Sequence, residues 1–235
     1  MTEHTYMKAV TSLTAGHFYV IGAGGDDDPQ HALDDIVITN TGTVALRIGH
    51  SLTGILSGGR YVQVAAGGSL PIEGDRDNLL VYNPDASTAG SFTISAECCY
   101  RNSGQDGGVL CAQDTPGSAT RYQVIRPTRT AGETVLTTVP VKYKRTITTI
   151  KGYSVTVPSG ATLTVDLLDS QSRSLLAAVM NQEALTTKTL YTATTVTTAY
   201  PDLLTVTKAC SLSCRSSAGG DTLGDLLIEI AHTRA

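Results

Sequence analysis

Short apolar and β-branched segments, separated by turn-forming residues, recur about every ten positions along this chain. In residues 44–48 (VALRI) and 91–97 (SFTISAE) every second side chain is apolar, which is the pattern of a strand with one buried face. The segments are interrupted at turn signals such as residues 40–42 (NTG) and 58–59 (GG). This rhythm is typical of antiparallel sandwiches and jelly rolls.

The composition favours the same fold class. The chain of 235 residues contains 35 Thr and 23 Gly. Thr is stiff at χ1 and prefers strands, and Gly supplies the turns between them. Charged residues make up only 16% and aromatic residues 5%. Helical bundles, coiled coils, doubly wound nucleotide enzymes and disordered chains are therefore disfavoured. We predict an all-β protein of two β-sandwich (jelly-roll-like) domains in tandem.

One segment departs from this pattern. Residues 175–185 (LLAAVMNQEAL) form the only stretch with a helical composition. Leu175, Leu176, Val179 and Met180 would share one face of a helix. A strand with a loop is the alternative interpretation of the same residues.

The best domain boundary lies in residues 101–120, which are rich in Gly, Ser and polar side chains. We predict an N-terminal domain at 1–104, a linker at 105–114 and a Thr-rich C-terminal domain at 115–235. The net charge of −4 is unevenly divided. Residues 1–100 hold 4 basic and 11 acidic residues, and residues 101–235 hold 13 basic and 10 acidic residues, which indicates two different units.

No membrane span or secretory signal is expected. No apolar run approaches the roughly 20 residues that a spanning helix needs. Residues 1–10 (MTEHTYMKAV) have no basic region followed by an apolar stretch. The chain has five cysteines. An odd number of cysteines without a secretory signal indicates reduced thiols in a cytosolic folding environment.

A zinc site is also disfavoured. Cys210 and Cys214 have a spacing that zinc sites allow, but the adjacent Cys98 and Cys99 would point to opposite faces of a strand. Together with Cys111, these residues are predicted to be small buried hydrophobes, and we expect neither metal nor cofactor.

Motifs for catalysis or nucleotide binding are not found. Residues 22–25 (GAGG) follow an apolar strand, but Asp27 stands where the third Gly of a dinucleotide loop belongs. Asp26, Asp27 and Asp28 lack the spacing of a calcium loop and are predicted to form a solvated loop tip, with a cation site as the alternative. The five histidines (His4, His17, His31, His50 and His232) show no i, i+4 pair, and no nucleophile elbow is present. We predict no catalytic residues and no enzymatic activity.

Nucleic-acid binding is disfavoured. The basic residues between Arg126 and Lys151 are interspersed mainly with Thr and Val rather than with stacking aromatic residues. This stretch is interpreted as solvated strand faces or a protein contact.

Four segments of the first half occur in a familiar order: residues 36–42 (IVITNTG), 44–49 (VALRIG), 64–70 (VAAGGSL) and 77–82 (DNLLVY). They resemble small β-sandwich structural proteins of tailed bacteriophages. The second half is similar to another phage β-sandwich type, through residues 163–165 (LTV), the excursion at 170–200 and residues 217–229 (SAGGDTLGDLLIE).

The resemblance implies a virion component that is assembled in the host cytoplasm, such as a capsid decoration (cement) protein or a head-fibre base. Its partners would be the major capsid protein or other virion subunits. It would form a homo-oligomer, by analogy a trimer, and association would also protect exposed strand edges. Three alternatives stay open: a tail or neck accessory protein, a carbohydrate- or receptor-binding module using Tyr61, Tyr82 or Tyr100, and a hydrolase with a convergent Ser/His/Asp set.

Overall fold

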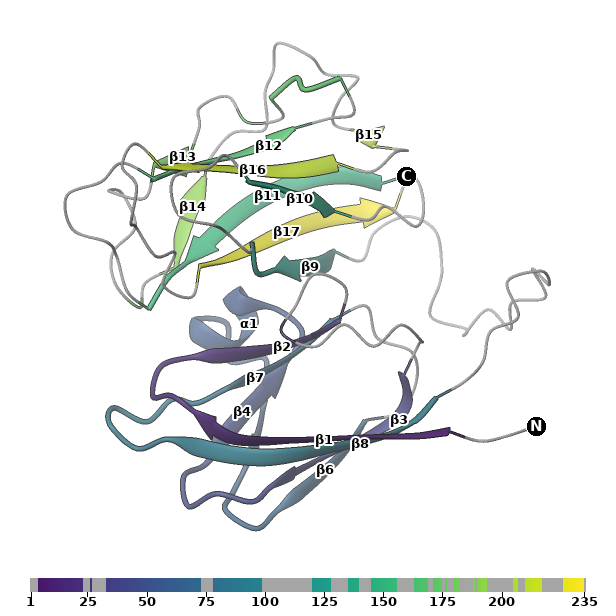
Figure 1. The fold of residues 1–235 in the computed structure, drawn as a ribbon, viewed down its shortest axis with the longest axis vertical. Coiled ribbons are helices and arrows are strands. Elements are labelled where there is room, and N and C mark those ends of the chain that lie inside the picture. Colours follow the sequence, from purple (N-terminus) through teal and green to yellow (C-terminus); the bar gives the residue numbers. More distant parts are fainter. Residues whose placement is uncertain are drawn as a thin grey trace. The chain divides into compact units, whose positions relative to one another are not determined.

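The computed structural model describes residues 4–22, 26, 33–72, 78–98, 120–127, 135–139, 145–155, 163–168, 171–174, 176, 180–181, 188, 190–193, 205–206, 210–216 and 226–234. The chain divides into two compact units, Met1–Thr115 (unit 1) and Pro116–Ala235 (unit 2). The fold is built almost wholly from antiparallel strands (Figure 1). The expected all-β class is therefore confirmed.

Unit 1 contains two four-stranded sheets. Its elements are β1 (His4–Leu13), β2 (Phe18–Gly22), β3 (Leu33–Asn40), β4 (Leu46–Gly49), α1 (Leu52–Leu56), β5 (Val62–Val64), β6 (Ser69–Ile72), β7 (Asn78–Tyr82) and β8 (Gly90–Cys98). Sheet A has the order β1-β8-β3-β6 and sheet B the order β2-β7-β4-β5. The pairing is nested: β1 with β8, β2 with β7, β3 with β6 and β4 with β5. Successive pairs of this nest thus lie alternately in sheet A and sheet B.

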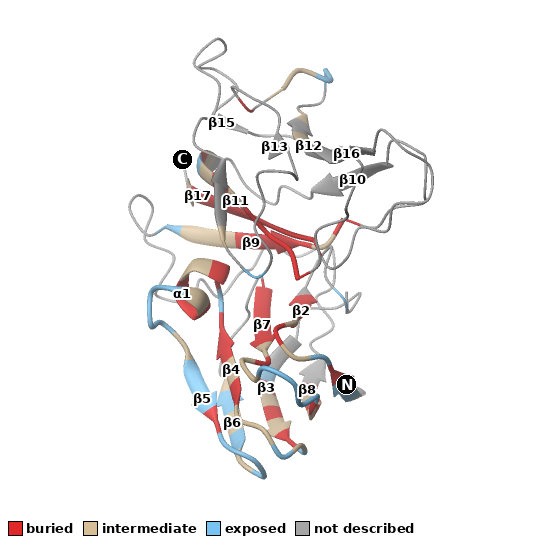
Figure 2. Ribbon diagram, turned by 90° about the vertical axis from the view of Figure 1, so that its left-hand side faces the viewer, coloured by how far each residue is buried: buried red, intermediate tan, exposed pale blue. Residues whose placement is uncertain are grey.

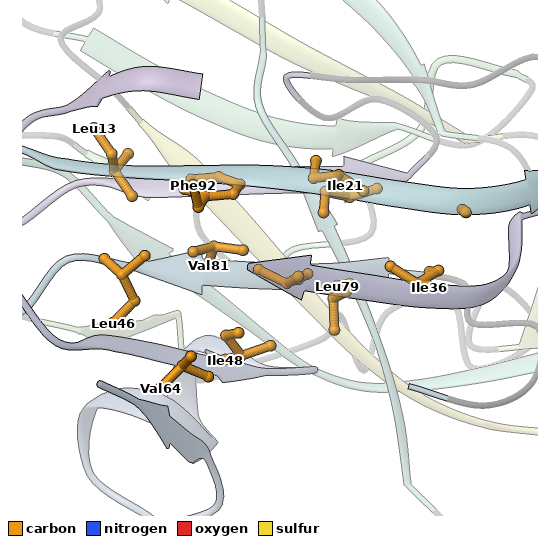
Figure 3. Close-up of a cluster of buried hydrophobic side chains, with 12 residues drawn as sticks. Leu13, Ile21, Ile36, Leu46, Ile48, Val64, Leu79, Val81 and Phe92 are labelled. Carbon is orange, nitrogen blue, oxygen red and sulfur yellow. The ribbon is translucent and has the colours of Figure 1, made fainter. Parts of the chain in front are cut away.

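The core of unit 1 lies between sheets A and B (Figure 3). Alternation along the strands supplies it, because every second residue faces inward. The buried cluster consists of Leu13, Ile21, Ile36, Ile38, Leu46, Ile48, Val64, Leu79, Val81, Phe92, Ile94 and Ala96. The alternating apolar faces predicted in residues 44–48 and 91–97 are thus inward-facing, and the short strands β5 and β6 consist mainly of exposed or half-buried residues (Figure 2).

The helix α1 was not predicted from the sequence, because five residues are too few to show a helical period. It begins after Ser51, whose hydroxyl accepts a hydrogen bond from the Gly54 N–H (2.9 Å). Its Ile55 lies on Gly49 of sheet B: a Cβ at Gly49 would come within 2.9 Å of Ile55 Cγ1. Gly49 follows the inward-facing Ile48, so α1 covers the outer face of this sheet.

Unit 2 also contains two antiparallel sheets. Its strands are β9 (Arg121–Ile125), β10 (Val135–Val139), β11 (Arg145–Tyr153), β12 (Leu163–Leu168), β13 (Met180–Asn181), β14 (Tyr191–Ala193), β15 (Thr205–Val206), β16 (Cys210–Ser216) and β17 (Leu227–Arg234). The sheet orders are β14-β11-β17-β9 and β10-β16-β12-β13, and β15 pairs with β11. The pairs β9–β17, β10–β16, β11–β14 and β12–β13 repeat the nesting of unit 1.

Two stretches of unit 2 can be compared with their local sequence pattern. Residues 146–150 (TITTI) and 153–157 (YSVTV) each have the composition of a separate strand, but β11 runs without a break through Tyr153, with a register shift between Ile147 and Thr149. In residues 175–185 the structure describes only Leu176, Met180 and Asn181. Met180 and Asn181 form β13 and pair with β12, which agrees with the strand interpretation left open above.

No helix in the described part of the chain is long and apolar enough to cross a membrane.

Candidate functional site

Four connections of unit 1 meet at one end of the sandwich, at the end of β1 far from the N-terminus (Figure 1). They are residues 14–17 (β1 to β2), 41–45 (β3 to β4), 65–68 (β5 to β6) and 83–89 (β7 to β8). The nested antiparallel winding explains this, because all odd-numbered strands run toward the same end. We call these four connections the loop end.

Asn40 joins two of these connections. It is fully buried at the end of β3, and its Nδ2 donates to the carbonyl oxygens of Val44 (2.8 Å) and Val64 (3.0 Å). Its Oδ1 accepts from the Gly42 N–H (3.0 Å). Its backbone exchanges two further bonds of 2.9 Å with the turn at 65–68. One side chain therefore fixes the β3–β4 and β5–β6 connections together.

Asn83 does the same for the other two connections. It is fully buried after β7, and its Nδ2 donates to the carbonyl oxygens of Leu13 and Thr88, both at 2.9 Å. Its Oδ1 accepts from the Asp85 N–H (3.1 Å). Its backbone bonds with residues 16 and 17 of the β1–β2 turn at 2.9 and 3.1 Å.

Ser91, near the start of β8, provides a third group of hydrogen bonds. The backbone N–H groups of Thr41 and Gly42 both donate to the Ser91 carbonyl oxygen at 3.0 Å. The Thr41 hydroxyl donates to the Ser91 hydroxyl at 3.2 Å. A Cβ at Gly42 would approach Ser91 N to 2.8 Å, so only glycine allows this contact. Because β8 directly follows the β7–β8 connection, the hydrogen bonds of Asn40, Asn83 and Ser91 together tie the four connections to one another.

The surface of the loop end is made of small uncharged groups. Its exposed residues are Thr14, Thr41, Thr43, Ala65, Ala66, Gly67, Ala86, Ser87, Thr88 and Ala89. The four connections contain two ionisable side chains, His17 and Asp85. His17 Nδ1 donates to the Ala15 carbonyl oxygen at 3.2 Å.

The carboxylate of Asp85 accepts hydrogen bonds from its own turn. Asp85 Oδ1 accepts hydrogen bonds from the N–H groups of Ser87 (2.9 Å) and Thr88 (2.7 Å). These backbone bonds favour the carboxylate and lower the pKa of Asp85 below its ordinary value. The single carboxylate of the loop end therefore stabilises the β7–β8 connection.

This arrangement is suited to contact with another protein surface. Small side chains lose little conformational entropy when they are immobilised, and a cross-linked backbone needs little ordering. A surface with few charges also has a low desolvation cost.

The aspartates that the sequence left open as a cation site are only partly described. Asp26 Oδ2 accepts a hydrogen bond from the Val20 N–H at 2.7 Å, and its own N–H donates to the Val20 carbonyl oxygen at 2.8 Å. Its negative charge adds to burial in raising the pKa of Tyr19. Asp27 and Asp28 lie outside the described residues. Asp26 thus has a structural role against β2.

The tyrosines proposed for sugar stacking contact neighbouring side chains. Tyr82 stacks on Phe18, with ring centroids 4.3 Å apart. The Arg47 guanidinium lies 4.6 Å from the centre of the Tyr61 ring, a cation–π contact. Tyr100 lies outside the described residues.

Other sequence candidates are scattered over several elements. Cys210 and Cys214 both lie on β16, where four residues span about 13 Å, too far for one zinc ion. Cys98 ends β8, while Cys99 and Cys111 lie outside the described residues. Among the described residues no group of three His, Cys, Asp or Glu side chains could hold a metal ion.

The described histidines do not gather either. His4 begins β1, His17 lies in the loop end, and His232 is buried on β17. His50 Nδ1 donates to the Asn78 carbonyl oxygen at 3.0 Å. His31 lies outside the described residues.

The sequence missed the role of Asn40 and Asn83. Asn40 belongs to the turn signal at residues 40–42, and Asn83 precedes Pro84, a residue that also interrupts strands. Their burial depends on carbonyl groups that are distant in sequence, such as Leu13 and Val64, and no local pattern encodes that.

No protein-family model and no curated protein matches the sequence. Among solved structures, the chain is similar to the STIV MCP with 11% identity, covering 98% of this chain and 97% of that one, at a TM-score of 0.29. It is also similar to the major capsid protein P2 of bacteriophage PM2, with 10% identity, at a TM-score of 0.30. This match covers 97% of this chain and 96% of P2. A third similar structure is VP2 of infectious bursal disease virus, with 11% identity and a TM-score of 0.27. This match covers 99% of this chain and 72% of VP2. At such low TM-scores these likenesses carry no argument about the function of this chain.

Proposed function

We propose that this chain is a non-enzymatic structural protein of a phage virion, which binds capsid subunits and decorates or cements the head. Supporting this proposal is the resemblance of both halves to phage β-sandwich proteins, in segments such as residues 36–42 and 217–229. The single structural observation that carries it is the loop end, a rigid, small-residue surface with one carboxylate engaged in its own turn.

The proposal includes two finer points. Both units are jelly rolls in tandem, which is supported by their matching nested pairing. The chain acts as a homo-oligomer, by family analogy a trimer, whose loop ends contact neighbouring capsid subunits. A place on the tail or neck would use the same surface against a different subunit.

The test is cosedimentation of the purified chain with empty heads of the phage that encodes it, together with detection of the chain in purified virions. We expect saturable binding to heads. A double variant, Thr43→Glu with Ala86→Glu, places two charges on the exposed loop end. Because burying unpaired charges opposes association, its affinity for heads should fall at least about tenfold.

Met7→Glu is the matched control, because Met7 is 74% exposed and lies on β1 outside the loop end. This variant should bind heads like the wild type. If the chain neither binds heads nor occurs in virions, the proposed function is wrong. If both variants bind equally well, the loop end is not the contact surface.

A further inference from the structure

The two sheets of unit 1 end in four edge strands: β1, β2, β5 and β6. An open edge presents unpaired N–H and C=O groups to which a strand of another chain can add. Two of these edges are poor templates. Strand β5 has only three residues, and β6 has four residues including Pro71, which has no N–H to donate.

Strand β2 is closed by a residue of its own chain. Val20 pairs with Leu80 of β7 on one side. On the other side Asp26 satisfies both backbone groups of Val20, through its Oδ2 at 2.7 Å and its N–H at 2.8 Å. Asp26 therefore takes the place that one residue of an added strand would occupy.

Strand β1 is the longest edge, with ten residues, and β8 is its only partner among the described strands. Tyr6 and Val10 of β1 pack against the core, and Lys8 lies between them on the same inward face, directly opposite the fully buried Ile94. Lys8 is nevertheless exposed. Its side chain therefore begins on the inner face and carries its ammonium around the sheet edge into water.

We propose that Lys8 and Asp26 prevent a strand of another chain from pairing with β1 and β2, the two longer edge strands of unit 1. A strand placed beside β1 would extend the inner face over Lys8 and enclose its ammonium beside Ile94 without a partner, which is costly. Unit 1 then meets other proteins through the loop end and not through its edges. Association with further copies is not needed to protect these edges, because this chain's own residues protect them.

The test measures the self-association of the purified full chain by light scattering and sedimentation over a range of concentrations. Lys8→Val removes the charge and keeps a residue that favours strands. We expect the average mass of the Lys8→Val variant to rise to that of at least two wild-type particles. Its β1 amides should exchange hydrogen more slowly, because an added strand would pair with them. Lys8→Arg keeps the charge and should match the wild type. Asp26→Ala removes the carboxylate that accepts from the Val20 N–H on the outer side of β2, and it should also raise the average mass.

The proposal is overturned if folded Lys8→Val or folded Asp26→Ala keeps the wild-type mass, or if wild-type β1 amides become protected as the concentration rises. Lys8→Thr serves as the second variant if Lys8→Val does not fold, and the same criteria apply to it. The measurement uses the chain alone. Its outcome is therefore independent of whether the chain binds capsids.

Discussion

At the scale of single residues, two buried asparagines decide the shape of the loop end. Asn40 and Asn83 each end a strand, and each uses all its polar side-chain atoms on backbone groups. An amide suits this position because it offers two donors and an acceptor without a charge. A buried carboxylate or an aliphatic side chain would leave the carbonyl oxygens of Leu13 or Val64 without these donors.

We predict that Asn83→Ala lowers the free energy of unfolding of unit 1 by about 2–4 kcal/mol, because three hydrogen bonds are lost and buried carbonyl groups lose their donor. Urea unfolding, followed by circular dichroism, measures the change. Asn83→Asp keeps the acceptor but not the donors, so it should also be destabilising. The control Thr43→Ala alters an exposed side chain and should stay within about 0.5 kcal/mol. An Asn83→Ala effect as small as that of the control would contradict the anchoring role.

At the scale of elements, the short helix α1 depends on a close contact with sheet B. Gly49 ends β4 and pairs with Leu80 of β7. The absence of a side chain at Gly49 lets Ile55, which is 1% exposed, lie directly on the sheet. The helix is too short to be stable by itself, so this packing and the Ser51 cap hold it in place.

We expect Gly49→Ala to cost about 1–3 kcal/mol, because its Cβ would overlap with Ile55. Ile55→Ala should cost about 2–5 kcal/mol by leaving a cavity. Since the smaller side chain makes room for the new Cβ, the double variant should cost about 1 kcal/mol less than the sum. A double-mutant cycle by urea unfolding gives this coupling. Strict additivity would show that the two residues do not interact.

At the scale of the whole molecule, unit 1 has a core of its own. Every member of its buried cluster lies between Leu13 and Ala96, and the cluster draws on both sheets. A region with its own core can fold alone. The chain therefore combines at least one self-contained sandwich with a second β-rich unit.

We predict that residues 1–115, produced alone, unfold in one cooperative transition with the β-type circular dichroism spectrum of a folded sandwich. Phe92→Ala in this fragment should lose about 3–5 kcal/mol, because a fully buried ring is removed. Such a loss is a large fraction of the stability of a small domain. A fragment that stays unfolded, or that unfolds without cooperativity, would show that the core of unit 1 is not sufficient.

The fold class and most strand positions follow from local sequence patterns. Alternation in residues 44–48 and 91–97 predicted β4 and β8, because a half-buried strand needs an apolar residue at every second position. The apolar run at residues 226–230 (LLIEI) is likewise typical of a strand, and β17 contains almost all of it. These features are local, so a short window of residues carries them.

How the loop end is built and how the strand edges are closed became visible only in the folded chain. Asn83 meets the Leu13 carbonyl oxygen across 70 positions, and Lys8 lies opposite Ile94 because β1 pairs with β8. Asp26 is exposed, as a solvated loop tip requires, and it also bonds with the backbone of Val20. Strand pairing brings together residues that are far apart in sequence, and no local pattern specifies which strands will pair.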